Sequence, residues 1–497
     1  MTTGNACLPA LHFLDPAAIS AIIDKACGLL MTPGIRINHH QTLDMLHQNG
    51  ARVDMDHNMA HISPDLVERA LKTVPPAIAL YNRSGRETVR LGKNCLSFVA
   101  GSSAPFILDA DTHHPRPVQT DDLIKFLRLS NHLPHLQHAN PALIPADVPE
   151  KVSDVFRCFL ALKYASKPMA VGMSRLGSFG VLKEMLAACA GSEKEMQIKP
   201  RLTFACTTRS PLTWDESAAQ HLIDCARCGI PVRIIPAPIS GATAPATLMG
   251  TVVQHTAENL SGIAIHQLAN AGAPIIWGTA ATVMDMRSGA SLFGSIESKM
   301  INVANCRVAG HLKMPSYALL SFSDAKRVDA QAGLESISGV LLGALADVSM
   351  IGGAGMMESG LCQSFEKLVL DNDICGMCQR LAAGMACSED AFANGLIQEI
   401  GPKGNFLATG HTLSWARSEQ YYPSSIIHRS SREDFINSGS KDVYSTAREI
   451  IHHLLADDEP ASYREDKKSN LVKIMSAYAK RCGLEYLPDQ EKMKSIN

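Results

Sequence analysis

The chain contains 497 residues, of which 46% are hydrophobic and 19% are charged, and its formal net charge is −2. This balance is typical of a globular protein with a large core, and it argues against a nucleic-acid partner or an acidic tail. The N-terminus has no basic region followed by a long apolar core, so we expect no signal peptide. The 14 cysteines lack a compact spacing, which favours the reducing cytoplasm.

The first 90 residues predict a small helical N-terminal segment. The stretches "DPAAISAIIDKACGLL" and "SPDLVERALKTV" both have helical apolar spacing, and they begin with the good N-caps Asp15 and Ser63. A strand around "IALYNR" is expected to end this segment.

Residues 91–400 contain eight short apolar runs, each followed by a loop and then a helical pattern. Strands that alternate with helices predict parallel pairing with crossover helices, and eight such units predict a closed barrel. We therefore expect the α/β class and a (β/α)8 TIM barrel with helical N-terminal and C-terminal additions. The eight runs are "CLSFVA" from Cys95, "HLQHAN" from His135, "PMAVGM" from Pro168, "RLTFACT" from Arg201, "PVRIIPA" from Pro231, "PIIWGTA" from Pro274, "PSYALLSF" from Pro315 and "DVSMIGGAG" from Asp347.

After the barrel, residues 401–497 are expected to form a Gly-rich loop and a charged helical segment that packs on it. The longest weakly polar run lies near 339–357, but Asp347 interrupts it, so we expect no membrane span.

Two patterns could in principle bind a metal. The pairs Cys225/Cys228 and Cys375/Cys378 fall in predicted helices. Four such thiolates could bind zinc, but buried cysteines more often simply pack in the core. His132, His135 and His138 are spaced by three, but Pro134 breaks the helix and turns their side chains apart. We therefore expect no metal, and keep zinc at the cysteine pairs as the alternative.

The loops after the predicted strands should line the active site, because residues at the C-terminal ends of barrel strands do so. These loops are mostly small and neutral, and few acid–base groups interrupt them. The charged residues are Arg209, Asp285, Arg287, Asp324, Lys326 and Glu358. The aromatic residues are Phe98, Phe106, Trp214, Trp277, Tyr317 and Phe322, which are core residues by default but together could wall a cation site.

Several of these loops resemble motifs of the trimethylamine methyltransferase family. The stretches are "MDMRSGASLFGS" at 284–295, "SDAKRVDAQAGLES" at 323–336, "GAGMMESGLCQSFEKLVLDND" at 353–373 and "EIGPKGNFLATGHTL" at 399–413, with "LYNRSGRETVRLG" and "FVAGSSAPFILD" nearer the N-terminus. The resemblance covers the chain from about residue 15 to about residue 455. It implies a barrel enzyme that moves a methyl group from a methylated amine to a corrinoid on a partner protein.

The family's namesake carries pyrrolysine, whereas this sequence contains only standard residues and resembles the branch without it, which acts on quaternary amines such as glycine betaine. The resemblance implies no permanently bound cofactor, a corrinoid (cobalamin) supplied by the partner protein, and a homo-oligomer in the cytoplasm. The loop from Asp324 to Gln331 is the expected neighbourhood of the pyrrolysine position.

For such a substrate, Glu358 is the expected catalytic residue. Its negative charge would line the site and attract the cation. Phe98, Phe106, Trp277, Tyr317 and Phe322 are expected to bind the ammonium group. Arg209, Arg287 or His311 would face a substrate carboxylate, and Asp324 and Gln331 complete the expected binding residues.

Two alternatives stay open from the sequence. A barrel lyase or aldolase would need a Schiff-base lysine or a metal at the mouth, and Lys326 with Asp324 beside it is the candidate. A non-catalytic amine-binding or corrinoid-docking protein would need no acid–base residue at all.

Overall fold

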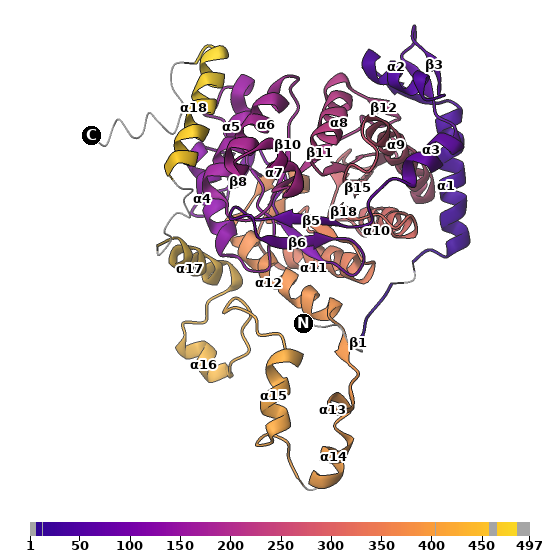
Figure 1. Cartoon of the computed structure of the whole chain (residues 1–497). Coiled ribbons are helices and arrows are strands. Elements are labelled where there is room, and N and C mark those ends of the chain that lie inside the picture. The colour runs from indigo at the N-terminus through magenta and orange to yellow at the C-terminus, as the bar shows by residue number, and fades with distance from the viewer. Residues whose placement is uncertain (1–5, 12, 403, 457–464, 485–497) are drawn as a thin grey trace.

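The computed structural model describes residues 6–11, 13–402, 404–456 and 465–484. Its centre is a parallel barrel (Figure 1) whose seven-stranded sheet has the order β10-β11-β13-β15-β18-β19-β7. These strands coincide with seven of the eight predicted runs, which confirms the predicted fold class. They are β7 (Ser97–Ala100), β10 (Met169–Gly172), β11 (Leu202–Cys206), β13 (Val232–Ile234), β15 (Ile275–Thr279), β18 (Ser316–Leu319) and β19 (Met350–Ala354).

The remaining predicted run, from His135, closes the ring between β7 and β10. It forms only single parallel bridges, Val99 with His138 and Ala139 with Met169. The side chain of Gln137 explains the irregularity, because its Oε1 accepts the Phe98 N–H at 2.9 Å, where a strand would offer a backbone carbonyl. The eighth position of the barrel is therefore occupied, but by a reduced strand.

Helices surround the barrel and begin directly after its C-terminal loops. The side chains of Ser295, Asp329 and Ser364 accept hydrogen bonds from the first turns of α10, α11 and α12, so these caps fix where each mouth loop ends. The surrounding helices are α4 (Thr120–His132), α5 (Glu150–Tyr164), α6 (Ser178–Ala190), α7 (Glu193–Ile198), α8 (Glu216–Cys228), α9 (Leu248–Ala269), α10 (Ile296–His311), α11 (Ala330–Leu345) and α12 (Phe365–Ala382).

One helix approaches the barrel closely because of a glycine. A Cβ atom at Gly339 of α11 would overlap the carbonyl oxygen of Leu320, whereas Gly333 in the same helix has open space around it. The glycine at 339 thus lets α11 pack directly on the end of β18, which carries one of the mouth loops.

The N-terminal region is helical, as expected, but it also contains small sheets. The predicted caps are confirmed, since Asp15 accepts the Ala18 N–H at 2.7 Å and Ser63 accepts the Leu66 N–H at 3.3 Å. The hairpin β5–β6 covers the N-terminal end of the barrel, where the Tyr81 N–H donates to Pro200 O just before β11. The elements are α1 (Pro16–Met31), β2 (Ile35–Ile37), α2 (His40–Gln48), β3 (Arg52–Asp54), β4 (Met59–His61), α3 (Pro64–Leu71), β5 (Ile78–Tyr81) and β6 (Glu87–Leu91), with β12 (Thr213–Trp214) joining β2.

Two small sheets form at the C-terminal end of the barrel, which we call the mouth. One sheet pairs elements from the loops after the first and eighth strands, and the other pairs elements from the loops after the fifth and sixth. They tie loops that are distant in sequence into one rim. The first has β8 (Phe106–Leu108), β9 (Pro115–Pro117), β20 (Met356–Met357) and β21 (Cys362–Gln363), and the second has β14 (Ile239–Ser240), β16 (Thr282–Met284) and β17 (Ser291–Leu292).

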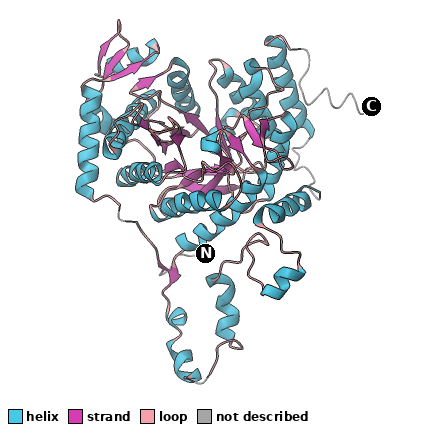
Figure 2. Cartoon of the chain, turned by 180° about the vertical axis from the view of Figure 1, so that it is seen from behind, coloured by secondary structure: helices cyan, strands magenta, loops and turns pink. Residues whose placement is uncertain are grey.

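Beyond α12 the chain leaves the barrel and returns to it. Residues 383–419, which we call the arm, project away from the body in Figures 1 and 2. At the root of the arm, β22 pairs with β1, and the Sγ atoms of Cys7 and Cys387 lie 2.9 Å apart. The elements are β1 (Ala6–Cys7), β22 (Met385–Ala386), α13 (Glu389–Phe392), α14 (Asn394–Ile400) and α15 (Gly410–Glu419).

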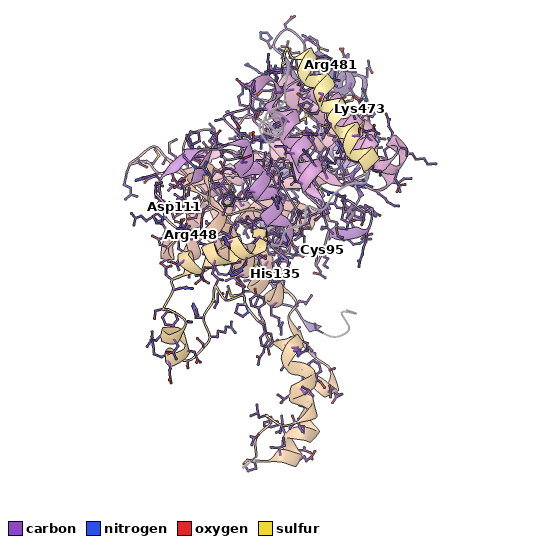
Figure 3. The ribbon with its side chains drawn as sticks, turned by 90° about the vertical axis from the view of Figure 1, so that its left-hand side faces the viewer. Cys95, Asp111, His135, Arg448, Lys473 and Arg481 are labelled. Atoms are coloured by element: carbon purple, nitrogen blue, oxygen red, sulfur yellow. The ribbon has the colours of Figure 1, made fainter. Side chains whose placement is uncertain are left out.

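After the arm, three more helices follow. Arg448 pairs with Asp111 at 2.7 Å and anchors α17 beside the hairpin β8–β9 (Figure 3), while Leu471 and Met475 of α18 are buried against α5 and α6. Within the described ranges no helix is long and apolar enough to span a bilayer. The elements are α16 (Arg432–Asn437), α17 (Val443–Ala456) and α18 (Glu465–Arg481).

Candidate active site at the barrel mouth

Glu358 lies at the mouth, in a single 3-10 turn (Glu358–Gly360) after β20. Its φ is +51° and that of Ser359 is +54°, a left-handed conformation that non-glycine residues rarely adopt. Hydrogen bonds hold the turn, since the Glu358 N–H donates to Ala325 O and the Ser359 N–H to Ser323 O. The half-buried Glu358 carboxylate has no hydrogen bond or ion pair with any other described residue. Backbone strain at a charged, unpaired residue is a feature of functional sites.

Phe322 packs against this turn, and Phe293 stacks on Phe322. The rings of Phe293 and Phe322 lie with their centroids 4.6 Å apart and nearly parallel, and Phe322 is 2% exposed. A Cβ atom at Gly353 or Gly360 would overlap the Phe322 ring, so a glycine before the Glu358 turn and the glycine that ends the turn make room for it. The turn that carries Glu358 is therefore packed against an aromatic pair through Gly360.

Asp324 joins the loops after the sixth, seventh and eighth strands. It accepts hydrogen bonds from the Phe293 N–H (3.1 Å), the Gly294 N–H (2.9 Å) and the Ser359 hydroxyl (2.8 Å). Burial raises the pKa of Asp324, and these hydrogen bonds oppose that rise. Because its oxygens are engaged by the protein, Asp324 orients the loops around Glu358 and leaves little capacity to bind a ligand.

Behind this loop, Glu335 and Lys299 form a second polar layer that the sequence analysis missed. Glu335 accepts from the Ser323 hydroxyl at 2.6 Å and the Asp324 N–H at 2.7 Å. Burial raises the pKa of Glu335, but the hydrogen bonds outweigh it, and the pKa is lowered overall. Burial also lowers the pKa of Lys299 to about 8, although its Nζ donates to Glu335 O at 2.6 Å.

The ion pair between Lys367 and Asp371 was also not predicted from the sequence. Both side chains are fully buried, with Nζ and Oδ2 2.6 Å apart. Lys367 donates to Ser321 O at 3.1 Å, and Asp371 accepts the Gly355 N–H at 2.6 Å, so the pair joins the C-terminal ends of the seventh and eighth strands. The only sequence signal was a lysine and an aspartate one helical turn apart within an otherwise apolar stretch.

The predicted aromatic residues are divided between two sides of the barrel wall. Trp277 lies 6.4 Å from the ring of His255 on α9, so it faces the helices. Phe98 pairs in register with Ile351 of the neighbouring strand β19, so the two side chains lie on the same face of the sheet. Ile351 contacts α11, and Phe98 therefore faces the helices too. Tyr317 points into the barrel, and Phe106 is 40% exposed on β8. Of the five residues expected to bind the ammonium group, Phe322 packs against the turn that carries Glu358, at Gly360.

The polar residues expected at the mouth are mostly engaged elsewhere. Arg209 pairs with Asp215 at 2.7 Å, and Arg287 pairs with Asp285 in its own loop at 3.0 Å. His311 ends α10, at the opposite end of the barrel. Gln331 is exposed and donates to Glu335, while Lys326 Nζ donates to Asp324 O at 2.6 Å. Among the six charged residues named from the loops, Glu358 alone lacks such an engagement within the described chain.

A basic residue that the sequence did not single out lies inside the barrel. Arg233 of β13 is 4% exposed, and its guanidinium lies 4.7 Å from the centroid of the Tyr317 ring. One Nη donates to Val171 O at 3.1 Å, whereas Nε has no partner and no carboxylate pairs with it among the described residues. Burial lowers the pKa of Arg233 without removing its charge. The barrel interior therefore contains a buried positive charge with no counter-ion from the described residues.

The described residues hold no group of three or more His, Cys, Asp or Glu side chains that could bind a metal ion. Cys225, Cys375 and Cys378 are buried in α8 and α12, in agreement with packing. His138 points into the barrel toward Ser97, while His135 contacts Gln379 on α12.

A cavity of about 400 Å³ lies at the other end of the barrel. It is lined by β5 and by Gln197, Asn270 and Pro274, and no charged side chain contributes to it. In TIM barrels this end supports stability, whereas catalysis takes place at the C-terminal end. We therefore place the candidate site at the mouth.

Comparison with known proteins gives a consistent result. A family model described as trimethylamine methyltransferase (MTTB) matches residues 2–482. A trimethylamine methyltransferase of Methanosarcina barkeri is 32% identical over 456 residues, covering 90% of each chain. A glycine betaine methyltransferase of Desulfitobacterium hafniense (strain Y51) is 28% identical over 421 residues, covering 84% of this chain and 87% of its own. The solved monomethylamine methyltransferase of Methanosarcina barkeri has the same fold, with a TM-score of 0.51 and 11% identity over 89% of this chain and 88% of its own.

Proposed function

Because the chain belongs to the trimethylamine methyltransferase family, we propose that it takes a methyl group from a quaternary amine, such as glycine betaine, and transfers it to the Co(I) corrinoid of a partner protein. Its sequence contains no pyrrolysine, which supports a quaternary amine over trimethylamine as the donor. We place the reaction at the barrel mouth and the protein in the cytoplasm.

This reaction suits a site with few acid–base groups. The C–N bond breaks, its electron pair stays on the nitrogen, and a neutral tertiary amine leaves, so no proton has to move. The corrinoid supplies the nucleophile. The protein has to hold a cation, exclude water and direct one methyl group outward, and such positioning can provide much of a rate enhancement.

The observation that carries the proposal is the unpaired carboxylate of Glu358 in a mouth turn whose last residue, Gly360, packs on the Phe322 ring, which in turn stacks on Phe293. A carboxylate attracts a fixed positive charge more strongly in a dry site than in water, and an aromatic face adds about 0.5–2 kcal/mol of cation–π attraction. A quaternary ammonium cannot donate a hydrogen bond, so a carboxylate without a fixed hydrogen-bond donor is a suitable neighbour for it.

Arg233 supports a donor that also bears a carboxylate. A buried charge without a counter-ion is unfavourable, and an anionic group of the substrate would relieve it. A bare cation such as choline would instead meet repulsion from Arg233. A zwitterion such as glycine betaine offers an ammonium group for Glu358 and a carboxylate for Arg233.

The test is reconstitution with a reduced corrinoid protein and a panel of amines: glycine betaine, proline betaine, carnitine, choline and trimethylamine. We expect the demethylated amine by mass spectrometry and a matching change in corrinoid absorbance with one of the zwitterions. Binding of amines without any methyl transfer would favour a binding protein. Borohydride trapping of a substrate on Lys326 would favour the lyase alternative. No turnover with any quaternary amine and a matched partner would disprove the proposal.

A further inference from the structure

Two cysteines that are 380 positions apart in the chain meet at the root of the arm. Cys7 opposes Met385 in the antiparallel pair of β1 and β22, and Cys387 lies two residues after Met385, on the same face. The Sγ atoms of the two cysteines are 2.9 Å apart. Cys7 is exposed and Cys387 is partly exposed, so small molecules in solution can reach the pair.

The backbone at the root of the arm is built to bring β1 close. Gly384 has a φ of +70°, and a Cβ atom at this position would overlap the carbonyl oxygen of Cys7, so a glycine is required for the approach. The Gly384 carbonyl accepts a hydrogen bond from Arg380 Nη1 at 2.6 Å. Arg380 also binds Glu419, on the other leg of the arm, at 2.7 Å. The two thiols therefore belong to a junction that ordered backbone contacts maintain.

Few other contacts keep β1 on this junction. Each of the two strands has two residues, so their ladder contains only a few hydrogen bonds, and a short two-stranded pair is marginal by itself. Further along the chain, the Leu11 N–H donates to Leu345 O at the end of α11. A covalent bond between the cysteines would add a restraint that the hydrogen bonds do not supply.

We propose that Cys7 and Cys387 form a reversible disulfide that fixes β1 on the root of the arm. An S–S bond is about 2 Å long, so a shift of about 1 Å brings the two sulfur atoms to bonding distance. In reducing compartments disulfides are usually transient and respond to the redox state, and exposed ones are readily reduced. The pair therefore tightens the junction under oxidising conditions and releases it under reducing ones.

The oxidant that fits this exposed pair is a low-molecular-weight disulfide such as oxidised glutathione. The thiolate of one cysteine attacks a sulfur atom of the oxidant, so a mixed disulfide forms and one glutathione thiolate leaves. The thiolate of the other cysteine attacks the protein sulfur of this mixed disulfide and releases the second glutathione thiolate. The two thiol protons pass through solvent to the two glutathione thiolates. Two cysteines are thereby oxidised and one glutathione disulfide is reduced.

The test is peptide mapping of the full chain after incubation with oxidised glutathione at mildly alkaline pH and alkylation of the remaining thiols. Trypsin leaves Cys7 and Cys387 as the single cysteines of peptides 1–25 and 381–403. We expect these peptides to be joined, the intact single chain to lose about 2 Da, and dithiothreitol to reverse both changes. Cys387→Ser should abolish the joined product. The control Cys95→Ser, at another partly exposed thiol, should leave it unchanged.

Amide hydrogen exchange measures whether the disulfide fixes β1. Oxidation should slow exchange in the peptides that contain β1 and β22 at least about tenfold, and it should leave exchange in the double variant Cys7→Ser, Cys387→Ser unchanged. The map of the wild-type chain does not depend on how the variants fold.

Four results would each overturn the proposal. They are a product that contains only glutathione mixed disulfides, no joined peptide or one that involves a different cysteine, a bond between two chains, and unchanged exchange in the oxidised wild type. Neither measurement uses an amine or a corrinoid protein, so its outcome is independent of methyl transfer.

Discussion

At the level of single residues, the mouth combines one unpaired carboxylate with a network that fixes its surroundings. Asp324, Glu335 and the pair Lys367–Asp371 all hold loop backbone, whereas Glu358 holds nothing with its side chain. Its backbone nevertheless stays in a left-handed conformation. The strain is offset by neighbouring contacts, as expected for a residue kept in place for its chemistry.

Glu358→Gln removes the negative charge and keeps the shape of the side chain. Because no described partner depends on the carboxylate, we expect the thermal midpoint to change by about 1 °C or less, in the range of surface substitutions. Methyl transfer should fall at least about tenfold, since the attraction for the cation is lost. Glu68→Gln, on the exposed surface of α3, is the control for both measurements. An unchanged rate would remove Glu358 from the site.

Arg233→Met removes the buried charge that lacks a counter-ion. Stability should be unchanged or increased, because replacing a buried charge by an apolar side chain of similar volume is often favourable. The KM for glycine betaine should rise about 10–100-fold, the value of a hydrogen bond to a charged group, while amines without a carboxylate should not be weakened. Arg52→Met, on the exposed strand β3, serves as the control. Equal effects on both classes of amine would contradict a role in carboxylate binding.

The sequence could predict Glu358 because a charge after an apolar strand stands out. It could not single out Arg233, which lies within the apolar run "PVRIIPA" and is buried without a counter-ion only because of the barrel around it. The same limit explains why the sequence did not reveal that Phe98 and Trp277 face the helices. Whether an aromatic residue faces the barrel or the helices depends on strand register, which a run of consecutive apolar residues does not reveal.

At the level of elements, the contact of α11 with the end of β18 positions the loop that carries Phe322 and Asp324. Gly339→Ala should destabilise the protein by roughly 1–3 kcal/mol, the usual range for overpacking, because the added methyl group meets a backbone carbonyl. Gly333→Ala in the same helix meets open space and should stabilise by about 0.5–1 kcal/mol. Chemical unfolding of the two variants measures the difference. A change in the free energy of unfolding of the same sign in both variants would show that the space around Gly339 does not limit the size of the side chain there.

The predicted elements confirm that apolar periodicity carries most of the information on this fold. All eight barrel runs lie where the structure has a strand or a bridge, and the irregular run from His135 is the one reduced to single bridges. The small sheets at the mouth could not be predicted. Their strands have only two or three residues, which is too short to show a period. The pairings that tie separate loops together, β21 with β8 and β14 with β16, join segments distant in the chain, so no local pattern specifies them.

For the molecule as a whole, buried histidines make stability depend on pH. Burial lowers the pKa of His138, His255 and His266 to about 3, compared with 6.5 for a free side chain. Between these values the unfolded chain binds more protons than the folded one, so stability is fully present above pH 6.5 and is lost as the pH falls. At pH 5 each histidine should lower the free energy of unfolding by about 2 kcal/mol.

The thermal midpoint at pH 7.5 and at pH 5 measures this effect, and we expect a large decrease at pH 5. His57→Gln changes a side chain that is 75% exposed and should leave the decrease unaltered. The same midpoint at both pH values would show that these three histidines are protonated in the folded protein.

The arm shows where prediction from one chain ends. Its apolar residues give no strong helical period, and the sequence assigned residues up to 400 to the barrel and predicted that the Gly-rich loop and helical segment of residues 401–497 pack on it. The structure instead projects this segment outward. The exposed apolar residues of the arm, among them Leu407 and Leu413, are not distinguishable in the sequence from apolar residues of the core.

The contact between Cys7 and Cys387 has a consequence for the topology of the chain. Joining the two sulfur atoms would transfer two protons and two electrons to an oxidant and convert a linear polymer into a ring closed over 380 positions. The hydrogen bond to Cys387 raises the pKa of Cys7, and only the thiolate attacks, so exchange should be slow at neutral pH and faster in alkali. Samples handled in air and under reductant would then differ in connectivity, which electrophoresis without reductant can detect.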